Sequence, residues 1–187
     1  MGQPVVAAVT GERSEARLAA QQGVMPEVRH FRFDAPETYD AALAEVDRFF
    51  LMRPPQISDI RRTLAPAIDR AARKGVRQCV FLSLLGVERN PAVPHYKVER
   101  RLLASGMPTT FLRPSFFMQN LNTTHRAEIR DDDVIAVPVG KAKTSFIDVR
   151  DVGAVAAKVL TEDGHQGRGY DLTGGEALGY YQVAERF

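Results

Sequence analysis

The sequence predicts an α/β protein with a doubly wound, mainly parallel sheet. Its 187 residues suit one domain, in which short apolar runs alternate with segments of helical pattern. The apolar runs lack the in/out alternation of a half-exposed strand, and helical segments separate them. Strands of this kind are typical of a parallel sheet that is covered on both faces and joined by right-handed crossovers.

The first half of the chain is expected to supply three strands and three helices. The strands are predicted at 5–9, 28–33 and 47–52, and the helices at 12–22, 36–46 and 57–74. Pro36 opens the second helix at a position where proline is tolerated, whereas Pro66 is expected to kink the third.

The second half continues the alternation. Strands are predicted at 78–83, which is the most apolar run, and at 109–112. Helices are predicted at 97–105, before Gly106, and at 152–160, where Asp148 or Asp151 lies near the N-cap.

Composition excludes several classes of protein. The net charge of +2 argues against nucleic acid as an obligatory partner. The single cysteine, Cys79, excludes a disulfide framework and a thiolate metal cluster, and the adjacent carboxylates of Asp131, Asp132 and Asp133 cannot all face one ion, so no metal site is expected. No apolar run approaches the about 18 residues of a membrane span and no signal peptide opens the chain, so we expect no membrane association and a cytoplasmic location.

The predicted fold indicates where a ligand would bind. In an open parallel sheet, ligands lie beyond the carboxyl ends of the strands. The candidate loops are therefore 10–13, 32–34, 52–55, 83–86 and 113–117, although each also fits an ordinary strand-to-helix turn.

A dinucleotide site would require a glycine-rich turn between a first strand and its helix. After the first apolar run only Gly11 is present, and Gly174-Gly175 comes too late in the chain. The sequence therefore predicts weak dinucleotide binding, or none, for this chain.

Three segments carry a resemblance to a known family. They are Phe81-Leu82-Ser83-Leu84-Leu85-Gly86, Pro94-His95-Tyr96-Lys97-Val98-Glu99, and the run 105–120, which contains Arg113-Pro114-Ser115-Phe116-Phe117-Met118-Gln119-Asn120. Together with 146–152 and 170–174, they resemble the NmrA-like family of atypical short-chain dehydrogenase/reductase proteins. The resemblance implies a Rossmann-like fold, NADP or NAD as cofactor and a small-molecule substrate.

The resemblance also implies how the chain is organised. Members of the family begin with a strand, a glycine-rich turn and a helix before the strand matched here by 5–9, and they continue into a smaller helical portion at the C-terminus. We therefore expect residues 1–187 to form a partial NAD(P)-binding domain that lacks the first βα unit, with 114–147 and 170–187 contributing to a small substrate-side portion.

Cofactor contacts follow from the same resemblance. Thr10 and Arg13 fall where the family selects NADP, and Phe33 falls beside the adenine; Arg13 could equally be solvated and Phe33 could equally be core. Met52, Arg53 and Pro54 match the loop along the middle of the cofactor.

Catalytic positions are matched less completely. The tyrosine and lysine of the dehydrogenase pattern fall on Pro91 and His95, so the tyrosine is absent. The resemblance implies that His95 holds a ribose hydroxyl or donates a proton to a quinone, and we expect Glu99 to orient its imidazole. Ser83 matches a catalytic hydroxyl, but a serine that ends a strand is also a common turn residue.

The predicted substrate wall consists of Pro114, Phe117, Met118 and Asn120, although the same residues could simply pack against neighbouring structure.

The expected function is an NAD(P)H-dependent oxidoreductase that reduces quinones or similar electrophiles. The alternatives are an NAD(P)-sensing regulator and a fragment that binds no cofactor. A homo-oligomer or a regulatory protein partner is expected. His30, His125 and His165 are expected on the surface.

Overall fold

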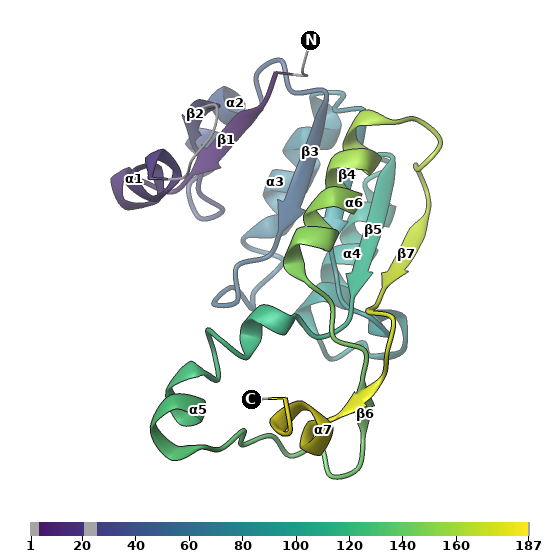
Figure 1. Ribbon diagram of the computed structural model, residues 1–187. Coiled ribbons are helices and arrows are strands. Elements are labelled where there is room, and N and C mark those ends of the chain that lie inside the picture. Colours follow the sequence, from purple (N-terminus) through teal and green to yellow (C-terminus); the bar gives the residue numbers. More distant parts are fainter. Residues whose placement is uncertain (1–3, 21–25, 187) are drawn as a thin grey trace.

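The computed structural model describes residues 4–20 and 26–186. Figure 1 shows strands with their arrows pointing toward a smaller group of elements at the C-terminal side. Most of the described strands are parallel, as predicted, and helices lie on both faces of the larger sheet.

The larger sheet contains four parallel strands in the order β3-β4-β5-β7. Their bounds are Arg48–Met52 for β3, Gln78–Leu82 for β4, Thr109–Pro114 for β5 and Gly169–Leu172 for β7. β4 lies in the interior of this sheet, and Cys79, Val80 and Phe81 are each 0% exposed. The strand predicted at 78–83 is therefore confirmed over Gln78–Leu82.

A second, smaller sheet pairs β1 (Val6–Val9) with β2 (Glu27–His30) in parallel. β1 lies between β2 and β3 (Figure 1), but within the described residues no strand pairing joins β1 to β3. The single sheet expected from the sequence is thus divided into two parts.

The core lies mainly on one face of the four-stranded sheet. There α3 (Leu64–Arg73) and α4 (Pro94–Ala104) pack on Leu51, Phe81 and Phe111, which are aligned across three neighbouring strands. α6 (Val149–Thr161) covers the opposite face, where Val80, Leu112 and Val159 are buried together. The Asp148 side chain accepts a hydrogen bond from the Arg150 amide and is the N-cap of α6, one of the two predicted positions.

Two helix predictions are wrong at their boundaries. The helix expected at 57–74 begins only at Leu64, because the chain before it turns within the loop that follows Pro54-Pro55. Pro66 therefore lies in the first turn of α3, where its missing amide is not needed and no kink is required. The helix expected at 36–46 is a 3-10 turn, η1 (Pro36–Thr38), followed by the short α2 (Tyr39–Ala42).

Smaller differences affect the first elements. The strand predicted at 28–33 is shorter and ends at His30, and the helix predicted at 12–22 is α1 (Glu12–Ala19). Gly23, expected to close that helix, lies outside the described residues. The 3-10 turn η2 (Val87–Arg89) connects β4 to α4.

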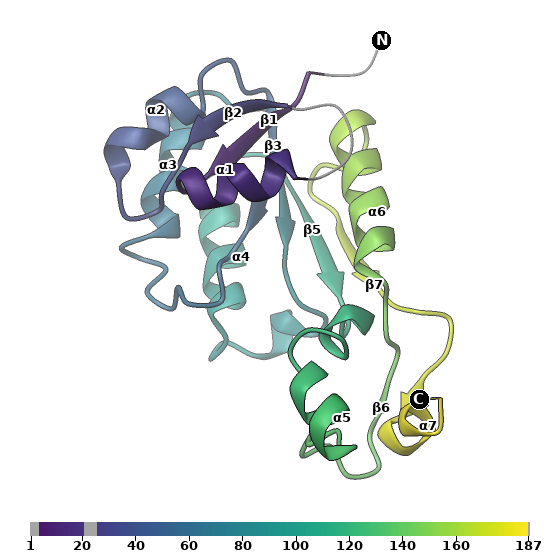
Figure 2. The same ribbon diagram turned by 60° about the vertical axis from the view of Figure 1, so that its left-hand side comes forward.

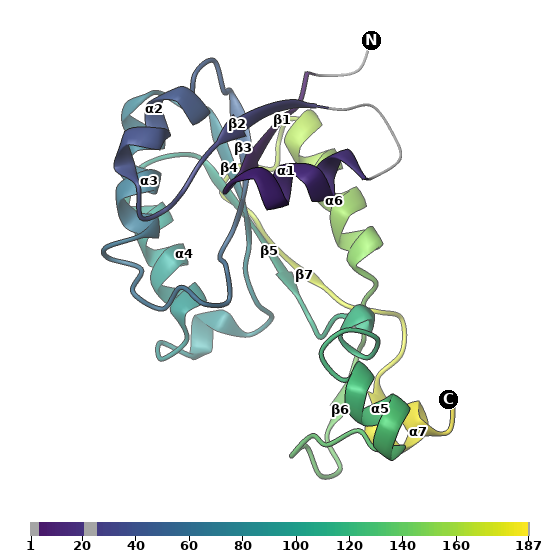
Figure 3. The same ribbon diagram turned by 90° about the vertical axis from the view of Figure 1, so that its left-hand side faces the viewer.

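A small C-terminal portion lies beyond the carboxyl ends of the four strands (Figures 2 and 3). It comprises η3 (Met118–Asn120), α5 (Arg126–Asp132), β6 (Lys143–Thr144), β8 (Leu178–Gly179) and α7 (Tyr180–Ala184). Its buried cluster contains Phe146, Leu178 and Val183, with Phe116 and Tyr180 packed against them. This cluster is separate from the two that cover the sheet.

Candidate functional site

An open cavity of about 500 Å³ lies where the carboxyl ends of β1, β2 and β3 meet. It contains three of the predicted cofactor residues: Thr10, Phe33 and Pro54. The rest of its lining is Arg32, Asp34, Gln56, Ile57, Ser58, Asp59 and Thr63. The position agrees with the rule that ligands bind beyond the carboxyl ends of parallel strands.

Thr10 is held by the start of α1. The Thr10 and Gly11 amides both donate to the Ser14 hydroxyl, at 3.0 and 3.2 Å. The Thr10 side chain remains exposed at the edge of the cavity. Arg13, on the same helix, is exposed and does not line the cavity, which agrees with the alternative that it is solvated.

Phe33 lines the cavity and also packs against the main core, which agrees with the alternative that it is a core residue. Its ring meets Phe31 edge to face at 4.9 Å, and its carbonyl accepts a hydrogen bond from the Tyr39 hydroxyl at 2.8 Å. An aromatic ring in the wall of a cavity is suited to stacking a flat base.

Arg32 and Asp34 flank Phe33 and were not among the predicted site residues. Two guanidinium nitrogens of Arg32 donate to the Asp34 carboxylate, at 2.9 and 2.7 Å, and lower the pKa of Asp34. Both side chains are exposed, so the pair is accessible to a ligand. The sequence placed these residues in a candidate loop but gave no sign that they pair with each other.

Arg53 folds the loop after β3 back on itself. One guanidinium nitrogen donates to the carbonyls of Pro54, Pro55 and Ile57, at 2.8, 3.1 and 2.6 Å. Its Nε is buried without a partner among the described residues, and burial lowers the pKa of the guanidinium. The prolines supply no amides here, so the loop contributes shape to the cavity wall. Met52, the third predicted residue of this segment, is 58% exposed and lies outside the lining.

His95 lies in the first turn of α4, and its half-buried ring is 6.0 Å from the ring of Phe81. Burial, and then the nearby positive charge of Arg53, lower the pKa of His95 to about 4. The imidazole is therefore uncharged at neutral pH, with one nitrogen able to donate and the other able to accept a hydrogen bond.

Glu99 does not hydrogen-bond His95, contrary to the sequence-based expectation. Its carboxylate instead accepts two hydrogen bonds from Arg113 on β5, at 3.0 and 2.8 Å. The expectation fails because the neighbouring strand brings a guanidinium to the same carboxylate, and a bidentate pair of this kind is stronger than a single bond to a neutral ring.

Ser83 follows β4 and is 1% exposed. Its amide donates to the Leu112 carbonyl at 2.7 Å, whereas its hydroxyl is buried with no partner among the described residues. A hydroxyl in this state lies at the correct strand end for catalysis but is not open to a substrate in this conformation.

The predicted substrate wall is divided by burial. Pro114 is buried at the end of β5, whereas Met118 is 45% exposed and Phe117 and Asn120 are half-buried. Phe117 bridges to Ile147, and the Met118 amide donates to the Ile147 carbonyl at 2.8 Å, so this wall is fixed to the segment that leads into α6.

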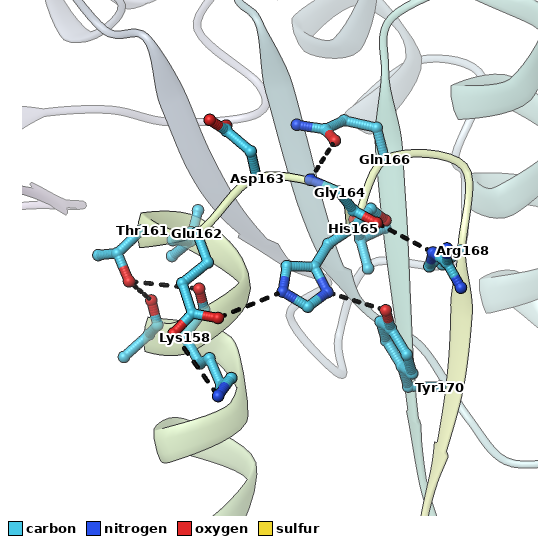
Figure 4. A network of polar contacts seen from close by, with 12 residues as sticks. Lys158, Thr161, Glu162, Asp163, Gly164, His165, Gln166, Arg168 and Tyr170 are labelled. Carbon is cyan, nitrogen blue, oxygen red and sulfur yellow. Dashed lines mark hydrogen bonds and ion pairs between the residues drawn. The ribbon is translucent and has the colours of Figure 1, made fainter.

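Two histidines expected on the surface are half-buried and paired, so that prediction is wrong for them. His125 Nδ1 lies 2.6 Å from Glu128, and its ring lies 6.1 Å from the ring of Phe116. His165 Nδ1 lies 2.8 Å from the Tyr170 hydroxyl (Figure 4), at the amino end of β7 and away from the cavity. His30 is exposed, as predicted.

Within residues 4–20 and 26–186, no group of three or more His, Cys, Asp or Glu side chains is placed to hold a metal ion. None of the helices described has both the length and the apolar character needed to cross a bilayer.

Comparison with known proteins decides the family. The model of the NmrA-like family matches residues 2–187. The chain belongs to the NmrA-like family. Its resemblance over the segments 81–86, 94–99 and 105–120 is thereby confirmed, and its Rossmann-like α/β fold is the fold expected of the family.

Curated relatives include enzymes of known activity. An NAD(P)H azoreductase of Xenophilus azovorans is 34% identical over 181 residues, which cover 95% of this chain and 62% of the relative. Prestalk A differentiation protein A of Dictyostelium discoideum is 32% identical over 83% of this chain and 50% of the relative. The chain thus spans between half and two thirds of the length of these relatives.

Solved structures confirm the fold. The NADPH-dependent quinone oxidoreductase of Escherichia coli, complexed with NADPH, aligns with a TM-score of 0.83 and 27% identity over 96% of this chain and 63% of the other. The triphenylmethane reductase of a Citrobacter species, complexed with NADP(H), aligns with a TM-score of 0.81 at 22% identity over 96% of this chain and 64% of the other, which shows the fold alone.

Proposed function

We propose that this chain forms the adenosine-binding and acceptor-facing parts of an NAD(P)H-dependent oxidoreductase that reduces quinones or similar small electrophiles. The observation that carries the proposal is the cavity at the carboxyl ends of β1, β2 and β3, which contains Thr10, Phe33 and Pro54. Relatives named as an azoreductase and a quinone oxidoreductase support the reaction class.

The residues fit the two halves of the cofactor unequally. Phe33 lines the cavity with an aromatic ring that can contact an adenine, and Arg32, whose Nε and Nη2 donate to Asp34, retains Nη1 as a donor to a phosphate or a ring nitrogen. The turn after β1 contains Gly11 alone, and the Thr10 and Gly11 amides already donate to Ser14. The adenosine half therefore fits the described residues, whereas the pyrophosphate finds no glycine-rich turn among them.

When bound, NAD(P)H supplies a hydride to the acceptor. The role proposed for the protein is to hold a hydrogen-bond donor against an oxygen of the substrate, the molecule that receives the hydride. A neutral His95 donates through one ring nitrogen while the other nitrogen accepts, so it polarises a carbonyl without adding a full charge. Phe117, Met118 and Asn120 are proposed to form the wall that contacts a flat substrate, within a substrate-side portion at 114–147 and 170–187.

A regulator that binds NAD(P) without turnover is the second candidate. One observation favours it: Pro91 occupies the position of the tyrosine that donates a proton in the dehydrogenase pattern, and it lies before α4 begins. The proposal that this chain is a reductase therefore depends on His95.

Calorimetric titration and a reductase assay test the proposal together. The 187-residue chain is titrated with NADPH and with NADH, and oxidation of each cofactor is then followed with a panel of quinones. We expect a dissociation constant weaker than about 10 µM, near −7 kcal/mol, because the pyrophosphate lacks its amides. Quinone-dependent oxidation supports the reductase, and binding without oxidation supports the regulator. No binding at millimolar cofactor would overturn both.

A further inference from the structure

We propose that Arg113 is a positioning residue for His95: it holds the Glu99 carboxylate in a bidentate ion pair and thereby keeps the neighbouring His95 imidazole uncharged. The inference joins two groups that the sequence places far apart, one on β5 and one on α4. Its bearing on catalysis rests on the proposed function, but the charge of His95 is a property of the ligand-free chain.

The first support is the closeness of Glu99 to His95. The two residues are four apart on α4, so they share a helix face with Cβ atoms about 5–6 Å apart. The Glu99 side chain is 6% exposed, so water hardly screens its charge. An unpaired carboxylate at this position would favour the imidazolium form of His95 strongly.

The second support is the bidentate ion pair that Arg113 forms with the Glu99 carboxylate. Both Glu99 oxygens accept from the guanidinium, and Arg113 itself is only 20% exposed. The guanidinium carbon lies 5.6 Å from the centre of the Phe111 ring, and a carboxylate oxygen of Glu88 lies 4.0 Å from one guanidinium nitrogen. Asp171 on the neighbouring strand β7 adds a further negative charge facing Arg113.

The third support is the room left for the guanidinium on β7. A Cβ built on Gly169 would lie 3.1 Å from a guanidinium nitrogen of Arg113, so any larger residue there would crowd the ion pair. Gly169 pairs with Phe111 across the two strands, which fixes this space relative to Arg113. The sheet thus determines the position of Arg113, and Arg113 determines the position of Glu99.

The charged groups that face His95 come from two elements. Arg53, from the loop after β3, disfavours the imidazolium, and Glu99, from α4 itself, favours it. β4 contributes the uncharged Phe81 ring. Burial and Arg53 outweigh Glu99, so the pKa of His95 is lowered to about 4.

The test is an NMR titration of His95 in the ligand-free chain, with the resonance assigned by its loss in His95→Gln. In Arg113→Met we expect the pKa of His95 to rise by about one unit or more, since Glu99 then has no other cationic partner as close. In the double variant Arg113→Met/Glu99→Gln we expect it to return to the value of the unsubstituted chain.

The double variant separates electrostatics from loosened packing. If Arg113→Met only let water reach His95, the pKa would stay raised after Glu99 is neutralised, and the proposal would be wrong. An unchanged pKa in the folded single variant would overturn it equally. If Arg113→Met does not fold, Arg113→Lys with and without Glu99→Gln gives the same comparison, with a smaller rise expected because lysine offers no bidentate fork. All of these outcomes are independent of cofactor binding and turnover.

Discussion

The strands β1 and β4 are both rich in apolar residues, but they differ in how completely other elements cover them. β4 has neighbours on both edges and helices on both faces, and Cys79, Val80 and Phe81 are fully buried. β1 has one neighbouring strand, and Val9 is its only buried residue; α1, which follows it, has none. An apolar run therefore becomes core only where other elements cover it from both sides.

The predicted site residues lie on both sides of this division, and His95 is not among the residues that line the cavity. Thr10 and Phe33 come from the thinly covered side, whereas His95 is fixed on α4 by the densely packed side. We therefore expect substitutions on the two sides to have different consequences, which four measurements can test.

The largest contrast is in stability. Leu102 on α4 is fully buried, so Leu102→Ala should lower the free energy of unfolding by about 3 kcal/mol, through lost burial and the remaining cavity. Leu18 on α1 is half-buried, and Leu18→Ala should cost less than about 1 kcal/mol. Urea denaturation measures both values. Equal losses would show that the β1–β2 unit is as well packed as the larger sheet.

The next effect concerns His95 on the densely packed side. His95→Ala should slow quinone reduction by about tenfold or more, near 1.4 kcal/mol of transition-state stabilisation. Tyr96→Phe is the matched control, because Tyr96 is the next residue of α4 and has no proposed role. Unaltered kinetics in His95→Ala would remove this residue from the mechanism.

A smaller effect is expected on the thinly covered side. Phe33→Ala should weaken NADPH binding by about two- to tenfold, through loss of one aromatic contact. Phe50→Ala changes a 40% exposed ring that does not line the cavity, and it should leave the affinity unchanged. Calorimetric titration of both variants checks this, and equal affinities would place the adenine elsewhere.

A further effect on the densely packed side is the dependence of stability on pH. The pKa of His95 falls from 6.5 in the unfolded chain to about 4 in the folded one, so the unfolded chain binds the proton first as the pH falls. The contribution of a neutral His95 is complete above pH 6.5 and is lost between pH 6.5 and about 4. Thermal melting of His95→Gln should therefore show less destabilisation than the unsubstituted chain over this interval. Parallel melting curves would contradict the buried, neutral imidazole.

The sequence by itself determined the fold class and the edge of the sheet that carries the site. Apolar runs separated by helical segments require a parallel sheet, and parallel strands bring the loops that follow them to one edge. For that reason the loops 10–13, 32–34 and 52–55 could be predicted to lie at one edge, and the structure brings Thr10, Phe33 and Pro54 from these loops into one cavity. The helix boundary at Leu64 could not be predicted, because the preceding segment has a helical pattern but is held in a turn by Arg53.

Tertiary structure alone decided which polar groups pair. Spacing along α4 suggested that Glu99 orients His95, but β5 brings Arg113 against the same carboxylate. The burial of the Ser83 hydroxyl likewise depends on the elements that pack around the end of β4. Sequence periodicity shows which face of an element is apolar, whereas the partner of a buried charge is set by whichever neighbouring element lies within hydrogen-bonding distance.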